Sequence, residues 1–194
     1  MEKYWDGENW LTVYKIDHFE QYYLNGNLHR KDGPAKICYY TNGQILKKFY
    51  HQNEKYHRED GPAVIYYYEN GLKGSEEYYN NGQIYRENGP AFIFYYENGN
   101  IEKELYFKNG KYKENGPALI WYYENGNVKE KNYFKNNKLH KENGPSVFEY
   151  NIDGYLKKEY YYFNGNDISK EDINFYFPID TKEKKLYIKL KYGE

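Results

Sequence analysis

The chain has 194 residues, 29 of them tyrosine, with a formal net charge of −1 and a single cysteine, Cys38. The lack of a basic excess argues against a nucleic-acid partner, the wealth of aromatic residues argues against intrinsic disorder, and no apolar run is long enough for a membrane-spanning helix. Because the first residues contain no apolar signal segment and Cys38 has no second cysteine to pair with, we expect a cytoplasmic protein.

Residues 1–24 are predicted to form an N-terminal cap followed by half of a repeat. Residues 10–16 alternate between apolar and polar side chains, which is typical of a half-buried strand. Residues 19–24 then lead into an Asn25-Gly26 turn, which matches the second half of the units that follow. A cap is expected at this end because the first strand of an array exposes unpaired backbone groups that another chain could bind.

Residues 25–166 are organised by a Gly-Pro dipeptide that recurs at intervals of 28, 28, 27 and 28 residues. It begins at Gly33, Gly61, Gly89, Gly116 and Gly144. In the second unit the strand after Gly-Pro is closed by Asn70-Gly71, and both residues accept the positive φ of a two-residue hairpin turn. A further turn follows 11 residues later in every unit. Each unit is therefore predicted to contain two strands and a short extended connection.

The predicted fold class is all-β: an elongated, twisted antiparallel β-meander of about five 28-residue hairpin repeats with a cap at each end. Ten or more strands about 4.8 Å apart give a sheet on the order of 50 Å long. With a twist of about 20–25° per strand, such a sheet would turn through more than half a revolution. The C-terminal cap is assigned to residues 167–194, in which 172–178 and 185–192 have the pattern of strands.

The first strand of each unit presents two different faces. One face carries a small, a branched and an aromatic residue, as in Ala63, Ile65 and Tyr67, and we interpret it as the packed interior. The other face is apolar and aromatic in the middle repeats, which favours a protein-binding surface. The candidate residues of this surface are Tyr66, Phe92, Phe94, Leu119 and Trp121. The alternative is that the sheet curls and buries this face on itself, or that the caps cover it.

A basic residue recurs in the connection before each Gly-Pro, at Arg30, Arg58, Arg86, Lys113 and Lys141. This column could bind phosphates or the head groups of anionic lipids. Acidic residues follow it immediately, for example Glu59 and Asp60, and these favour Arg–carboxylate pairs that brace the Gly-Pro turn. The lipid-binding and the structural interpretations both remain open at this point.

Histidines occupy one connection position in three units, at His29, His57 and His140. Zinc accepts imidazole ligands, but no cysteine or carboxylate recurs consistently beside these histidines. We therefore expect them to support the turn by hydrogen bonding, and we predict no metal and no other cofactor. No nucleophile–base arrangement or phosphate-binding loop occurs either, and Cys38 lies within a strand, where packing is the simpler role. We predict that the protein is not an enzyme.

Three stretches carry a family resemblance. They are PAVIYYYENG with EEYYNNGQ at residues 62–71 and 76–83, PAFIFYYENGNIEKELYFKNGK at residues 90–111, and PALIWYYENGNVKEKNYFKNNK at residues 117–138. They resemble MORN-type repeats, and most closely the variant class found in bacterial and large DNA-virus proteins. The resemblance extends over roughly residues 20–165 and implies one antiparallel hairpin per repeat, stacked into a single elongated sheet. It also implies a scaffolding role, and we expect the scaffold to bind another protein or to associate with itself through its sheet edges. Lipid association, an antitoxin-like role, inhibition of a host-defence protein and a place in a virion are the alternatives it suggests.

Overall fold

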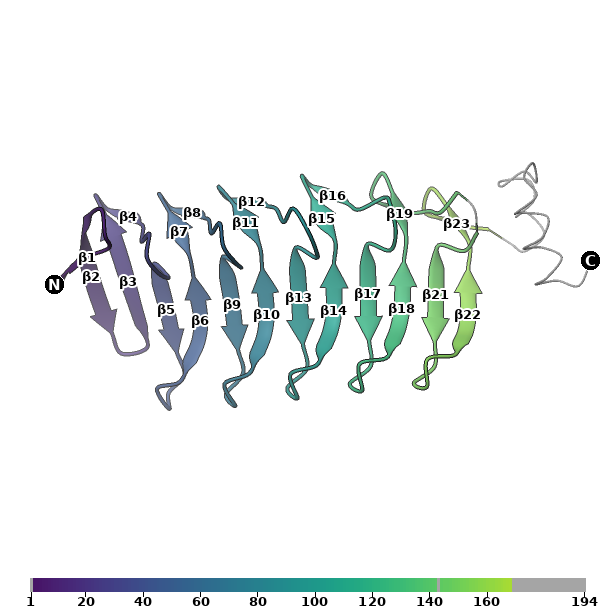
Figure 1. Cartoon of the computed structure of the whole chain (residues 1–194), viewed down its shortest axis with the longest axis horizontal. Coiled ribbons are helices and arrows are strands. Elements are labelled where there is room, and N and C mark those ends of the chain that lie inside the picture. Colours follow the sequence, from purple (N-terminus) through teal and green to yellow (C-terminus); the bar gives the residue numbers. More distant parts are fainter. Residues whose placement is uncertain (1, 143, 169–194) are drawn as a thin grey trace, which may run out of the picture.

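The computed structural model describes residues 2–142 and 144–168, and these residues form strands and turns without a helix (Figure 1). A single 14-stranded antiparallel sheet runs along them. Its strands follow chain order except for β4 (Asn27–Leu28), which pairs beside β3 (Phe19–Leu24) at the N-terminal end. The predicted antiparallel meander is therefore confirmed. The C-terminal cap predicted for residues 167–194 lies, beyond Ile168, outside the described residues.

The N-terminal strands β1 (Glu2–Trp5), β2 (Trp10–Ile16) and β3 surround a small core of their own. Leu11, Val13 and Tyr22 are buried, and Tyr4 packs against them with its ring edge-on to Tyr22, 5.3 Å between centroids. The loop between β1 and β2 is closed by Asp6, whose Oδ1 accepts hydrogen bonds from the backbone amides of Glu8 and Asn9. Apart from Tyr22, the side chains that hold this end of the sheet have no counterpart in the repeats.

The long hairpins of the five repeats have the same construction. They are β5 (Lys36–Tyr39) with β6 (Ile45–Phe49), β9 (Val64–Tyr67) with β10 (Lys73–Glu77), β13 (Phe92–Tyr95) with β14 (Ile101–Leu105), β17 (Leu119–Tyr122) with β18 (Val128–Asn132), and β21 (Val147–Tyr150) with β22 (Leu156–Tyr160). Each has a one-residue bulge in its second strand, at Gly74 in the second repeat. A Cβ on Gly74 would stand 2.3 Å from Cδ1 of Tyr66, so the tyrosine ring lies directly against this strand.

A second, smaller hairpin follows each long one and corrects the prediction of two strands plus an extended connection. The five are β7 (His51–Gln52) with β8 (Lys55–Tyr56), β11 (Tyr79–Asn80) with β12 (Gln83–Ile84), β15 (Phe107–Lys108) with β16 (Lys111–Tyr112), β19 (Phe134–Lys135) with β20 (Lys138–Leu139), and β23 (Tyr162–Phe163) with β24 (Asn166–Asp167). Their turns need two residues at positive φ, and Asn53 and Glu54 adopt φ values of 49° and 66° even without glycine.

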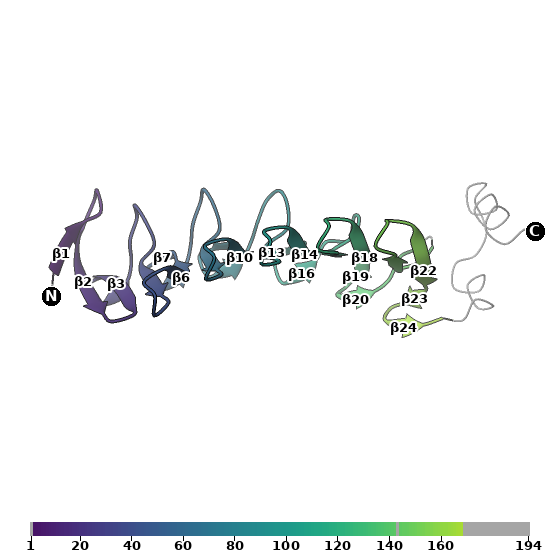
Figure 2. The same cartoon turned by 90° about the horizontal axis from the view of Figure 1, so that it is seen from below.

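The sheet twists less along the repeats than the half revolution that was expected. Figure 1 shows the long hairpins side by side with little change of direction, and Figure 2, which looks along the strands, shows an open row that does not curl back on itself. The curled alternative for the second face is therefore wrong. Flat sheets are unusual and depend on ladders of side chains, and such ladders link successive repeats here, as described below.

Burial distinguishes the two faces of the sheet. Ala35, Ala63, Ala91, Ala118 and Ser146 are completely buried, and Ile65, Ile93 and Ile120 are at most 8% exposed. Their face, called the packed face below, is the interior that the sequence predicted. The opposite face carries Tyr66, Phe94 and Trp121 and is called the aromatic face. Short strands such as β20 and β24 lie on one side of the long sheet in Figure 2.

Candidate binding surface

The basic column lies against tyrosine rings on the packed face. The guanidinium carbons of Arg30, Arg58 and Arg86 stand 4.2, 4.1 and 3.9 Å from the ring centroids of tyrosines eight residues earlier. Lys113 and Lys141 repeat the arrangement at 4.8 and 4.1 Å. The rings belong to Tyr22, Tyr50, Tyr78, Tyr106 and Tyr133. Stacking of a cation on an aromatic face stabilises both groups, so this column contributes to the packing of the repeats.

Carboxylates and glycines complete the sites of the first two arginines. Nε of Arg30 lies 2.7 Å from Asp32, and Nε of Arg58 lies 2.8 Å from Asp60. A Cβ on Gly33 or Gly61 would stand 3.0 Å from the guanidinium carbon. The glycine of Gly-Pro therefore leaves room for the arginine between the turn and the tyrosine ring. These contacts match the bracing role considered for the column.

Glutamates on the packed face accept hydrogen bonds from the tyrosines of the first strands. The hydroxyls of Tyr39, Tyr95 and Tyr122 lie 3.0, 2.9 and 2.8 Å from Glu20, Glu76 and Glu104. Burial, aided by the hydrogen bond to Glu20, raises the pKa of Tyr39 to about 12. Burial alone would raise the pKa of Glu20, but hydrogen bonds from its neighbours outweigh this effect and lower it.

The three connection histidines support the neighbouring repeat. Nδ1 of His29, His57 and His140 accepts a hydrogen bond from the backbone amide of an asparagine in the next short hairpin, at 3.3, 3.2 and 3.2 Å. The donors are Asn53, Asn81 and Asn164. Among residues 2–142 and 144–168, no cluster of His, Cys, Asp and Glu side chains is suited to a metal ion. The contacts are those of the turn-supporting role.

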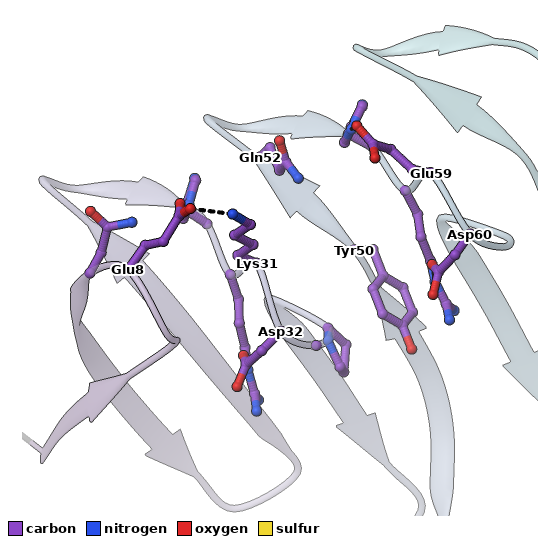
Figure 3. A pocket seen from close by; sticks show the side chains of 14 residues that line it. Glu8, Lys31, Asp32, Tyr50, Gln52, Glu59 and Asp60 are labelled. Carbon is purple, nitrogen blue, oxygen red and sulfur yellow. Dashed lines mark hydrogen bonds and ion pairs between the residues drawn. The ribbon is translucent and has the colours of Figure 1, made fainter.

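A polar cavity of about 690 Å³ lies between the N-terminal loop and the first two connections (Figure 3). Its charged side chains largely neutralise one another. Lys31 pairs with Glu8 across the opening, as the dashed line in Figure 3 shows. Arg58 pairs with Asp60 on the adjacent connection. A cavity whose cations already have carboxylate partners is a poor site for an anionic ligand.

The short hairpins cover one part of the aromatic face. The ring of Tyr56 stacks on Phe49 with centroids 6.1 Å apart, and Tyr79 meets Phe92 edge-on at 6.4 Å. Leu119 lies in the same row as Phe92, because both pair with Leu105. The predicted binding residues Phe92 and Leu119 are thus half-buried members of a row that lies beside the short hairpins.

The remaining part of the face carries three further rings. Tyr66, Phe94 and Trp121 occupy equivalent positions in three successive repeats, and all are half-buried. Nζ of Lys103 lies between two of them, 4.2 Å from the centroid of Phe94 and 4.5 Å from that of Trp121. Nζ of Lys47 lies 5.6 Å from Tyr66. The structure therefore brings together three of the five predicted residues and adds two lysines.

A second row of tyrosines, which the sequence analysis did not single out, runs beside these rings. Tyr66 and Tyr68 meet edge-on with centroids 5.4 Å apart. The row consists of Tyr40, Tyr68, Tyr96 and Tyr123, and each hydroxyl donates to a backbone carbonyl of the next repeat at 2.6–2.9 Å. The Tyr-Tyr pair before the turn of the first four long hairpins was the sequence signal for this row of hydrogen bonds. Tyr66, Phe94, Trp121 and this second row are called the aromatic surface below.

Asparagines add a further ladder at the same end of the hairpins. Nδ2 of Asn70 donates to the carbonyl of Glu97 at 2.8 Å, and Asn98 and Asn125 repeat the bond to the following repeat. The fifth repeat has Asn151 and Asp153 where the others have tyrosine and asparagine. Asn151 instead accepts hydrogen bonds from the amides of its own turn. The rings of the aromatic surface thus stand on a framework tied together at every repeat.

Two of the repeats match the model of a known family. Residues 91–109 and 119–136 match the model of the MORN repeat variant. Two of the chain's five repeats are therefore similar to the MORN repeat variant. The match covers the third and fourth repeats, whose hairpins β13–β14 and β17–β18 hold Phe94, Lys103 and Trp121. No curated protein is similar enough to the chain to be matched. The described residues contain no helix that is long and apolar enough to cross a membrane.

The first residue of each short hairpin is tyrosine or phenylalanine, except in the first repeat, where it is His51. The equivalent residues are Tyr79, Phe107, Phe134 and Tyr162. His51 is 7% exposed, its ring lies 4.5 Å from that of Tyr56, and its Nδ1 has no hydrogen-bond partner among the described residues. Burial lowers the pKa of His51. The folded state therefore resists protonation of this residue, and the protein loses stability as the pH falls below the ordinary histidine pKa of about 6.5.

We expect His51→Phe to raise the free energy of unfolding by about 1 kcal/mol at pH 8, as substitutions toward a repeat's common residue often do. The gain should be larger at pH 5.5, because the unfolded wild-type chain then binds a proton that the folded chain excludes. Urea denaturation followed by circular dichroism at the two pH values measures both effects. An equal gain at both pH values would mean that His51 titrates alike in the folded and unfolded chains.

Proposed function

We propose that the protein is a non-enzymatic scaffold that binds another protein through the aromatic surface. The observation that carries the proposal is the repetition of an aromatic pair, such as Tyr66 with Tyr68, at the same position in successive repeats. Tyrosine and tryptophan are the residues that contribute most to protein–protein binding. Their rings are held in place here before a partner arrives, which reduces the entropy lost on binding.

Binding to anionic lipid is the second candidate, and the contacts of the basic column count against it. All five cations stack on tyrosine rings, and Arg30 and Arg58 are also paired with aspartates. Flotation with phosphatidylserine vesicles at low salt separates the two candidates. We expect the protein to remain in the soluble fraction, whereas salt-sensitive flotation that Arg58→Ala abolishes would favour the lipid.

Partner capture by variants tests the protein-binding proposal. The full chain, immobilised, is used to capture proteins from the cells in which it naturally occurs. We expect Trp121→Ala to reduce the amount of a captured partner more than tenfold, since a central aromatic anchor contributes about 2 kcal/mol or more. Trp10→Ala removes another tryptophan, 64% exposed on the N-terminal hairpin, and should leave capture unchanged. Size exclusion with light scattering shows whether the partner is a second copy of the chain.

The opposite result is equally informative. If Trp121→Ala and Phe94→Ala leave capture unchanged but lower the melting temperature, the aromatic surface only stabilises the fold. The proposed function would then be wrong.

A further inference from the structure

The spacing of the aromatic surface matches one kind of extended ligand. Successive repeats are two strands apart, which is about 9.6 Å at a strand spacing of about 4.8 Å. A polyproline II helix has three residues per turn and rises about 3.1 Å per residue, so it repeats every 9.3 Å or so. After two repeats, the ligand and the surface differ by only about 0.6 Å. Because the long hairpins keep nearly one direction, a straight rod can touch them all (Figure 1).

Other backbone conformations fit this spacing less well. Two turns of an α-helix rise about 10.8 Å, so the mismatch with the surface reaches about 2.4 Å after two repeats. Side chains on one face of a β-strand recur every 6.6–6.8 Å or so, which does not coincide with a single repeat. Aromatic-lined grooves are also the surfaces that proline-rich segments bind elsewhere, because the ligand is already extended before it binds.

The positions between the rings vary in size and charge along the surface. Ser75 pairs with both Tyr66 and Phe94 and is 8% exposed, so only a small side chain separates these two rings. Lys47 pairs with Tyr66 on the other side, and Lys103 pairs with both Phe94 and Trp121. Neither lysine has a carboxylate partner within 4.0 Å among the described residues. Three consecutive repeats of the surface thus offer the cation of Lys47, the space above Ser75 and the cation of Lys103.

Building on the proposed function, we propose that the partner presents a proline-rich segment in the polyproline II conformation, with acidic residues six positions apart and a proline midway between them. The acidic side chains lie beside Lys47 and Lys103, and the central proline lies over Ser75 between Tyr66 and Phe94. Lys47 and Lys103 are two repeats apart, about 19 Å, and six residues of polyproline II span about 18.6 Å. The charges of the two lysines and the spacing of the repeats therefore favour the same ligand.

Fluorescence anisotropy with synthetic peptides tests the assignment on the full chain. The matched probe is a labelled Glu-Pro-Pro-Pro-Pro-Pro-Glu peptide. One control has lysine in place of both glutamates, and the other has four prolines instead of five between the glutamates. We expect the matched peptide to bind at least tenfold more tightly than either control, because reversing two charges or shifting one by about 3 Å removes attraction worth about 1.4 kcal/mol in total.

Charge exchange provides the second test. The double variant Lys47→Glu and Lys103→Glu should reverse the preference between the glutamate and lysine peptides, whereas a merely unfolded protein would bind neither. Trp121→Ala should weaken the matched peptide more than tenfold and Trp10→Ala should not. Equal binding of the matched and control peptides, or binding of none, overturns the polyproline assignment. The proposed function is tested separately, and it is wrong if Trp121→Ala and Phe94→Ala leave partner capture unchanged while lowering the melting temperature.

Discussion

Replacing Ala91 by leucine is expected to lower the free energy of unfolding by about 3 kcal/mol, the upper end of the usual cost of overpacking. Ala91 is completely buried on the packed face, and its backbone amide and carbonyl bond to Leu105 and Tyr78 in the neighbouring strands. The backbone therefore cannot move away to make room without loss of these bonds. Urea denaturation of the full chain measures the loss, which should lower the melting temperature by several degrees.

Ala91→Ser is the matched control, because the fifth repeat already has Ser146 at this position. Ser146 is also completely buried, and its hydroxyl accepts a hydrogen bond from the amide of Tyr162 at 3.0 Å. The equivalent amide in the third repeat is that of Phe107. We expect the serine variant to remain within about 0.5 kcal/mol of the wild type. Full stability of Ala91→Leu would show that the packed face has space that its complete burial does not suggest.

Removal of one hydroxyl from the packed face should have the second largest effect. Tyr95 donates its hydroxyl to Glu76, at 2.9 Å, and this glutamate is only 5% exposed. Glu76 also pairs with Lys73 through its other oxygen. Tyr95→Phe leaves the carboxylate with one side-chain partner fewer in a buried place, which we expect to cost about 2 kcal/mol, as hydrogen bonds to charged groups do.

Tyr67→Phe is the control for this prediction. Tyr67 has the same position in the second repeat, but the side chain near its ring is that of Lys48, with Nζ 5.4 Å from the centroid. Its hydroxyl has no hydrogen bond to a carboxylate within the part of the chain that the structure describes, so the free energy of unfolding should change by less than about 0.5 kcal/mol. Similar losses in the two variants would show that burial of the hydroxyl, and not the bond to Glu76, determines the effect.

The hairpins could be predicted because their determinants are local. Gly-Pro before a strand and Asn-Gly after it fix the turns through φ alone, and two-residue alternation assigns Ala91 and Ile93 to one face. The stacking of Arg86 on Tyr78 was not predicted, because the connection must first fold back over the sheet to bring them together. Alternation also placed Phe92 and Phe94 on one face, but of these two only Phe92 meets a ring of the short hairpins among the described residues.

The straightness of the repeats could not be derived from strand geometry alone. Average twist describes strands joined by backbone bonds, whereas here the hydroxyl of Tyr68 and the amide of Asn70 add bonds to the next repeat at one end of the hairpins. His57 adds another at the opposite end. Restraint at both ends opposes rotation of one hairpin relative to the next. The binding surface depends on this restraint, because a strongly twisted row would not present its rings along one line.

The side-chain bonds between repeats also give the array a direction. The first four long hairpins donate forward from a tyrosine hydroxyl, and the second to fourth donate from an asparagine amide as well. The fifth has Asn151 and Asp153 at these two positions. The number of repeats is therefore limited by the fifth repeat and not by the contacts between the other repeats. A duplicated copy of residues 89–115 placed in tandem would find donors behind it and acceptors ahead, and would lengthen the molecule by about 9.6 Å. The same repeat added after the fifth repeat would lack the tyrosine and asparagine donors that link the preceding repeats.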